Sequence, residues 1–240
     1  MLEHLTNQMS AVRNELALAT PQVSATYGDL LEKVEVWQQA LNNTGVASGD
    51  VAMLKGTFST ASISALIALL RHEAIIVLLA PTSYEKQAEF ADIGQVQWII
   101  DAETGRIVPR TATSDHPLYE RLRQNGEPGL VLFSSGSSGT SKGTVHSATR
   151  LMRKFATPGK TLRTLAFLLF DHIAGVDTLF YSLFNQSLLV VPADRSPAAV
   201  CALIAPHRVY VLPTAPTILI KLLLSGATSH HDLSELMISP

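Results

Sequence analysis

The sequence predicts an α/β protein with two lobes, each built on a largely parallel sheet. The first observation is a set of short apolar runs without alternation, such as Ala74–Ala80, which are typical of strands buried on both faces. The second is that segments with helical spacing of apolar residues separate these runs, as in parallel sheets whose connections are helices. The third is a single break in this rhythm over 101–128, where the chain is polar and weakly periodic. We therefore predict a first lobe with its connecting segment at 1–128 and the start of a second lobe at 129–240.

The first helix is expected directly after Thr26. This threonine is a typical N-cap residue, and Asp29, three positions later, stands where a capping box usually has glutamate. Apolar residues then repeat at helical spacing, at Leu30, Leu31, Val34, Trp37 and Leu41. The other elements expected in the first lobe are a strand at 51–54, a helix at 62–70, a strand at 74–80 stopped by Pro81, a helix at 84–93 ended by Gly94, a strand at 96–100 and a short helix at 118–123.

Residues 129–240 repeat the alternation of strands and helices. A strand at 129–133 leads into a polar loop, and a helix is expected to begin near Thr144. The elements expected after it are a strand at 162–170, a helix at 173–184, a strand at 187–191, a helix at 196–205, a strand at 209–212 and a helix at 213–224 with proline in its first turn.

The composition narrows the classes of partner. The 240 residues include 18 Lys plus Arg and 20 Asp plus Glu, a formal net charge of −2. A protein with this net charge is not expected to bind nucleic acid through its overall charge. Any anion that it binds must be held by a local group of donors or cations. The one cysteine, Cys201, lies in the apolar run AAVCALIA and is expected to be a buried hydrophobic residue.

No secretory signal or transmembrane segment is expected. The N-terminal MLEHLTNQMS lacks a long apolar core. The longest apolar region, 61–80, is interrupted by Arg71, His72 and Glu73, and neither side reaches the roughly 20 apolar residues that span a bilayer. A cytoplasmic location is the resulting expectation.

The segment from Ser134 to Lys142 contains only Ser, Thr, Gly and Lys, and it directly follows an apolar strand. Glycines at 136, 139 and 143 let the backbone turn and come close to a ligand. Free backbone N–H groups and hydroxyls are donors to phosphate oxygens, and Lys142 adds a positive charge. The segment therefore predicts a loop that holds the phosphates of a nucleotide.

The same segment could in principle be a P-loop or a flexible linker. The P-loop motif G-x-x-x-x-G-K-[ST] does not fit, because Thr140 and Ser141 separate Gly139 from Lys142, and Gly143 stands where a hydroxyl should bind Mg²⁺. A flexible Ser/Gly linker is the other possibility. A linker would not require the Thr-Ser-Lys-Gly ending or a position between a buried strand and a helix.

The string FSSGSSGTSKGTVHS resembles the phosphate loop of the adenylate-forming (AMP-binding) superfamily. The match covers Ser135–Gly143, with Ser141 where proline is commonest in the family. Four further segments resemble that family in its order: 26–54, 80–100, FLLFDHIAGVDTLFYSLFNQSLLVV and VYVLPTAPTILIKLLLSG. The chain is thus similar to the N-terminal part of an acyl-CoA synthetase or of an acyl- or aryl-acid AMP ligase.

The resemblance implies carboxylate activation by ATP with Mg²⁺, giving an acyl-AMP and pyrophosphate, followed by transfer to coenzyme A or to the phosphopantetheine of an acyl carrier protein. The residues that it assigns to the β- and γ-phosphates are Ser135, Gly136, Ser137, Ser138, Gly139, Thr140 and Lys142. It assigns His172 to the mouth of the substrate pocket, and Asp171 beside it. A helix-capping or surface role for His172 is the alternative. The expected substrate is a fatty or aromatic carboxylic acid; catalytic residues and protein metal ligands are not assigned.

The family pattern also includes parts that have no counterpart before Pro240. They are a glycine-rich adenine-binding strand, a Tyr-Gly-x-Thr-Glu segment and a small C-terminal domain with an adenylation lysine. We therefore expect an N-terminal portion of a ligase with little or no turnover alone. Half of a split enzyme and a non-catalytic binding module remain the alternatives, and a cut sheet would expose an apolar edge that favours dimerisation.

Overall fold

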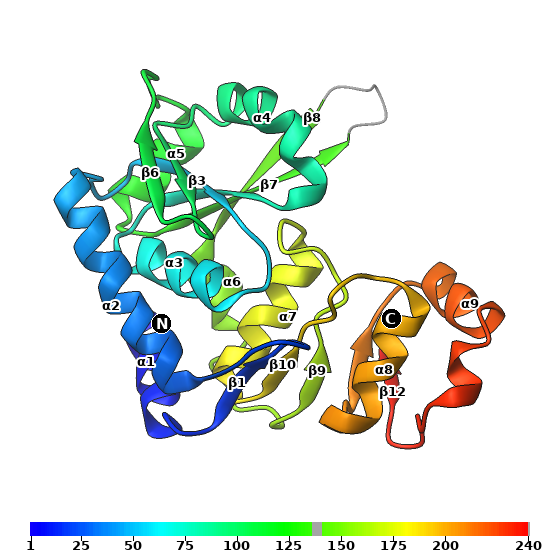
Figure 1. Cartoon of the computed structure of the whole chain (residues 1–240). Helices are drawn as coiled ribbons and strands as arrows, with labels where there is room; N and C mark the ends of the chain where they lie inside the picture. The colour runs from blue at the N-terminus through cyan, green and yellow to red at the C-terminus, as the bar shows by residue number, and fades with distance from the viewer. Residues whose placement is uncertain (136–140, 240) are drawn as a thin grey trace.

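The computed structural model describes residues 1–135 and 141–239. Its strands form two six-stranded sheets with helices between and outside them (Figure 1). Sheet A has the strand order β12-β11-β9-β10-β1-β2, and sheet B has the order β6-β5-β3-β4-β7-β8. Most neighbouring strands run parallel, so the predicted α/β class with largely parallel sheets is confirmed.

Sheet B is formed by the middle of the chain. Its strands are β3 (Val51–Lys55), β4 (Ile75–Leu79), β5 (Trp98–Asp101), β6 (Arg106–Pro109), β7 (Gly129–Ser135) and β8 (Ser141–Ser147). The four central strands β5, β3, β4 and β7 are parallel, and each outer strand is joined to its neighbour as an antiparallel hairpin.

Sheet A combines strands from both ends of the chain. Its strands are β1 (Leu16–Ala19), β2 (Ser24–Thr26), β9 (Arg163–Leu165), β10 (Leu188–Val190), β11 (Val211–Pro213) and β12 (Met237–Ser239). Among the described strands of sheet A, β1 and β2 pair antiparallel and the other pairs are parallel. The two sheets therefore draw on the segments before and after residue 128 alike, and the division into domains at that residue stays a prediction.

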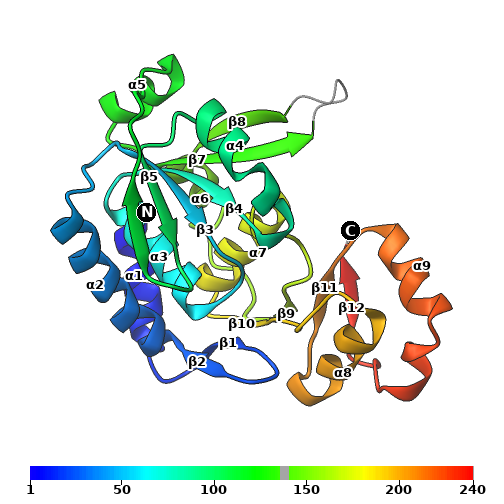
Figure 2. The same ribbon diagram turned by 45° about the horizontal axis from the view of Figure 1, so that its top comes forward.

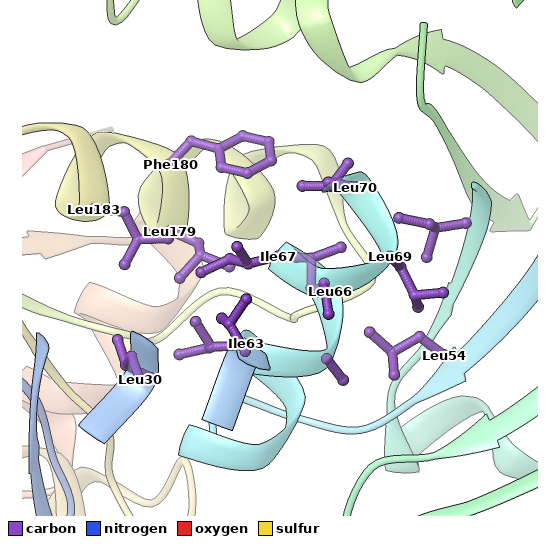
Figure 3. Packing of buried hydrophobic residues seen from close by; sticks show 14 of the residues in the cluster. Leu30, Leu54, Ile63, Leu66, Ile67, Leu69, Leu70, Leu179, Phe180 and Leu183 are labelled. Atoms are coloured by element: carbon purple, nitrogen blue, oxygen red, sulfur yellow. The ribbon is translucent and has the colours of Figure 1, made fainter. Parts of the chain in front are cut away.

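Helices form three layers around the two sheets. The layer between the sheets contains α1 (Leu2–Ala11), α2 (Tyr27–Thr44), α3 (Thr60–Arg71), α6 (Ala148–Arg153) and α7 (Ile173–Phe184), whose apolar side chains share one core with both sheets. Figure 3 shows the centre of this core, where α3 lies between α7 and β3. The outer face of sheet B packs against η1 (Pro81–Lys86), α4 (Gln87–Ile93) and α5 (Pro117–Gln124), and that of sheet A against α8 (Pro197–His207), α9 (Pro216–Leu224) and η2 (Ala227–His230).

Strand β3 explains why the apolar runs do not alternate. Ala52 and Leu54 face the central helices, whereas Val51 and Met53 face the outer layer, and all four are fully buried. A strand covered on both faces needs apolar residues at every position.

Several predicted elements are corrected. The helix expected near Thr144 begins only at Ala148, because residues 141–147 form β8 and Ser147 caps α6 by accepting a hydrogen bond from Arg150 N at 3.2 Å. The β-branched Thr144 and Val145 favour the strand. The strand expected at 162–170 is limited to β9, and the apolar residues after it are buried in a loop. The last helix begins at Pro216, and α1, β1, β2, β6 and β12 were not predicted.

The start of α2 confirms the predicted capping box. Thr26 Oγ1 accepts from Asp29 N at 3.1 Å, and Asp29 Oδ2 accepts from Thr26 N at 2.7 Å. The hydrogen bonds that Thr26 N and Thr26 Oγ1 donate to the Asp29 carboxylate hold its pKa below the usual value. No helix of the described part of the chain combines the length and the apolar character needed to cross a bilayer.

Thr26→Ala is expected to lower the free energy of unfolding by about 1 kcal/mol, because a first-turn N–H loses its acceptor. Thr44→Ala at the other end of α2 is the control, since its hydroxyl donates only to Ala40 O within the helix. Urea unfolding followed by circular dichroism measures both. Equal losses in the two variants would contradict a specific capping contribution.

Candidate functional site

The predicted phosphate loop joins the two strands of a long hairpin. β7 and β8 pair from Gly129↔Ser147 to Ser135↔Ser141. Ser135 ends β7, and Lys142 lies in β8 opposite Ser134. The predicted phosphate-binding residues Gly136, Ser137, Ser138, Gly139 and Thr140 lie outside the described residues.

An aromatic contact holds the hairpin next to the Ser134–Lys142 pair. Phe133 of β7 stacks on Phe90 of α4, with ring centroids 4.0 Å apart and planes 8° apart, and both rings are buried. A Cβ added at Gly143 would lie 3.2 Å from the Phe133 ring, so the glycine lets β8 cross close to it. The two strands are therefore fixed below the loop.

Polar groups are presented at the upper end of the same hairpin. Ser134 and Lys142 are exposed, and Lys142 has no carboxylate partner among the described residues. An exposed ammonium opposite the hydroxyl of Ser134 is suited to a phosphate. Farther down β8, His146 is half-buried, and burial lowers its pKa although the charge of Asp177 acts in the opposite direction. His146 pairs with Leu130, near the end of the hairpin away from Ser135 and Ser141, so it packs under the sheet and does not lie beside the predicted loop.

Asp171 connects the two sheets. Its side chain is 5% exposed, and Oδ2 accepts hydrogen bonds from Ala80 N at 3.0 Å and from Ser83 Oγ at 3.2 Å. Ala80 and Ser83 follow the carboxyl end of β4 in sheet B, whereas Asp171 follows that of β9 in sheet A. In open α/β sheets, ligands bind at the carboxyl ends of the strands, and Asp171 lies where two such ends meet.

Arg195 lies on the same edge of sheet A, after the end of β10. Its Nε donates to Phe167 O at 2.6 Å, and Nη2 donates to Leu168 O at 3.4 Å. Burial lowers the pKa of Arg195, and the nearby charge of Asp171 partly offsets this. The arginine thus braces the segment that carries Asp171, opposite the bonds from Ala80 and Ser83.

Two buried oxygens at this edge have no hydrogen-bond partner among the described residues: Asp171 Oδ1 and Thr214 Oγ1. Thr214 directly follows β11, so its position matches that of Asp171 after β9. Unpaired buried polar atoms are costly and require an explanation, for which a ligand or an ordered water is the usual one.

His172 is exposed at the N-cap position of α7, where its side chain makes no capping hydrogen bond. The structure therefore places both predicted pocket residues, Asp171 and His172, at the carboxyl edge of sheet A. No hydrogen bond or ion pair among the described residues joins either of them to Lys142 of the hairpin. Ser83 and Arg195 at this edge were not predicted from the sequence. Both follow apolar strands at their carboxyl ends, and this position is the signal that could have indicated them.

Within residues 1–135 and 141–239, no three His, Cys, Asp or Glu side chains come together as a possible metal site.

A family model described as AMP-binding enzyme matches residues 92–238. This range includes the β7–β8 hairpin, Asp171, His172 and Arg195. No curated protein matches the sequence significantly.

Solved structures share the fold of the chain. The N-terminal domain of FACL13 from Mycobacterium tuberculosis has a TM-score of 0.78 and 18% identity, over 99% of this chain and 69% of that one. The N-terminal subdomain of NpsA from Klebsiella oxytoca, bound to 3-hydroxybenzoyl-AMSN, has a TM-score of 0.78 and 19% identity, over 100% and 66%. The o-succinylbenzoate CoA synthetase MenE from Bacillus subtilis has a TM-score of 0.73 and 18% identity, over 92% and 50%. The chain thus spans from half to just over two thirds of these structures.

Proposed function

The chain belongs to the family of AMP-binding enzymes, and on this premise we propose that it supplies the phosphate-binding part and a part of the acid pocket of an ATP-dependent carboxylate ligase. The observation that carries the proposal is that Lys142 lies in β8 opposite Ser134 of β7, inside the family match, and that the Ser/Gly/Thr segment lies between these two paired strands in the sequence.

In this proposal the carboxylate oxygen of the substrate attacks the α-phosphorus of ATP, and pyrophosphate leaves. Residues 135–140 and Lys142 bind the β- and γ-phosphates, so that they stabilise the charge that develops on the leaving pyrophosphate. Mg²⁺ bound with ATP would neutralise part of the same charge. Lys142 contributes to this step by position and charge alone, since it exchanges no proton.

Asp171 and His172 are proposed to border the pocket for the acid. His172 is exposed at the edge where the strands end, and Asp171 fixes the loop that presents it. The proposed substrate is a fatty or aromatic carboxylic acid. Transfer to coenzyme A or to a carrier phosphopantetheine is proposed as the second half-reaction. Two structures with the same fold support these choices: NpsA was solved with 3-hydroxybenzoyl-AMSN, and MenE is a CoA synthetase.

An uncovered apolar surface favours a second candidate, in which the chain acts with another polypeptide. Ile220, Leu223 and Leu224 are 55%, 69% and 83% exposed and lie on one face of α9, at spacing i, i+3, i+4. Beside α9, β12 ends sheet A among the described strands (Figure 2). An apolar helix face next to an open strand edge is suited to bind another protein. That protein would be either a complementary chain that completes the ligase or a second copy of this chain.

ATP–pyrophosphate exchange with a panel of fatty and aromatic acids tests the proposal. The chain is measured alone and together with a candidate polypeptide that supplies the remaining part of the ligase. If the chain is half of a split ligase, pyrophosphate exchange should require the second polypeptide. Exchange by the chain alone would show that the chain is active without a partner. Lack of ATP binding and of exchange in both arms contradicts the ligase proposal and leaves a binding module, whose partner a pull-down would identify.

A further inference from the structure

A basic groove lies at the edge of sheet A opposite to Asp171. Because β9, β11 and β12 run parallel, their first residues lie together at one edge, while Asp171 and Thr214 follow the other ends. A groove of about 390 Å³ opens at this amino edge, lined by Lys160, Thr161, Leu162, Arg163, Arg208, Tyr210 and Glu235.

The groove concentrates positive charge in a chain whose formal net charge is −2. Three of the residues that line it are cations, and Glu235 is the one carboxylate. Glu235 pairs with Arg208 at 3.2 Å. Lys160 and Arg163 have no carboxylate partner within the described chain, so their charges are available to a ligand.

The backbone at both cations is held by hydrogen bonds, and so is the side chain of Arg163. Arg163 begins β9, which is paired on both sides, and its Nη1 donates to His207 O at 3.0 Å. The carbonyl of Lys160 accepts from Tyr181 Oη at 3.0 Å, and Tyr210 N donates to Arg163 O at 2.8 Å. The cations therefore project from an ordered rim, in contrast to lysines and arginines spread along an exposed helix.

Arg208 adopts a backbone conformation that favours glycine. It caps α8 with φ 49° and ψ 49°, in the left-handed region. Glycine would adopt this conformation without strain. Arginine at this position adds a charged side chain that lines the groove and pairs with Glu235. Strained backbone that presents a charged side chain is common at binding sites.

We propose that this groove binds an organic phosphate, with the phosphate held by Lys160 and Arg163 and the organic part against Tyr210. Guanidinium and ammonium groups together are the usual phosphate ligands, and the partly exposed ring of Tyr210 offers a face for a base or another planar group.

Titration with ADP, followed by backbone amide NMR, tests the inference and separates it from the phosphate loop. Amides of Thr161–Arg163 and Tyr210 report on the groove, and those of Ser141–Gly143 report on the hairpin. Lys160→Gln is expected to weaken the groove response about tenfold, because one charge-assisted bond is lost. This variant leaves the hydrogen bonds of the rim intact, since Lys160 contributes only its carbonyl to them.

Two control variants complete the experiment. Lys142→Gln should leave the groove response unchanged even where it abolishes that of the hairpin, so failure of the ligase proposal would not affect this result. Arg153→Gln, at an exposed cation of α6, should change neither response. Groove amides that ignore ADP, that respond equally to adenosine, or that respond only to a polyglutamate peptide would each overturn the inference.

Discussion

Replacing Gly175 with alanine is expected to destabilise the protein by about 3 kcal/mol, the upper end of the usual cost of overpacking. A Cβ at this position would lie 1.8 Å from Leu169 O and 2.7 Å from the carbonyl carbon of the same residue. Both contacts are backbone atoms, so no side-chain rotation can relieve them. The clash lies where the loop of Asp171 folds back onto the first turn of α7. Either the loop or the helix must move.

Ala174→Ser is the matched control, since it adds one heavy atom in the same turn at an exposed position and should stay within about 0.5 kcal/mol of the parent. Urea unfolding at equilibrium gives the free energies; if Gly175→Ala does not yield folded protein, its absence from the soluble fraction beside abundant Ala174→Ser protein is the expected extreme of the same effect. Equal stability of the two variants would mean that the loop does not press on α7 as described.

Elements whose sequence signal is local could be predicted from the sequence. The capping residues Thr26 and Asp29 and the helical spacing after them predicted α2, and the apolar run 173–184 between polar flanks predicted α7 with its observed bounds. Capping residues and helical spacing depend only on residues close in sequence, so they can be recognised without knowledge of the tertiary structure.

The elements that were missed depend on distant partners. β1 is apolar because it pairs with β10, some 170 positions later, and a strand of four residues has too little periodicity to be distinguished from a loop. Apart from Val145, the hairpin strand β8 consists of polar and small residues, so the weak local preference of Thr144 and Val145 for a strand is decided by pairing with β7. The same holds for the site: Asp171 could be singled out by its neighbours in sequence, whereas its bonds to Ala80 and Ser83 join segments that only the packing of two sheets brings together.

Lys142→Gln is expected to weaken ATP binding about 30-fold, equivalent to about 2 kcal/mol for a lost hydrogen bond to a charged group. The side chain is exposed, so the change should leave the stability of the fold unaffected. Glutamine keeps the length of the side chain nearly the same and removes the charge, and the loss should therefore shrink as salt is added to both proteins. Equilibrium dialysis with labelled ATP measures the affinities.

Lys33→Gln on the exposed face of α2 is the control for this experiment, because it removes the same charge at a position remote in sequence from the hairpin. If ATP binds the parent and the two variants equally well, the phosphates do not contact the hairpin and the proposed role of Lys142 is wrong. If only Lys142→Gln loses affinity and AMP binding is unchanged, the lysine acts on the β- and γ-phosphates. A loss of affinity for ATP but not for AMP agrees with the proposed chemistry. A charge placed at the leaving pyrophosphate stabilises the transition state of adenylation. A charge placed at the α-phosphate would bind product as tightly as substrate.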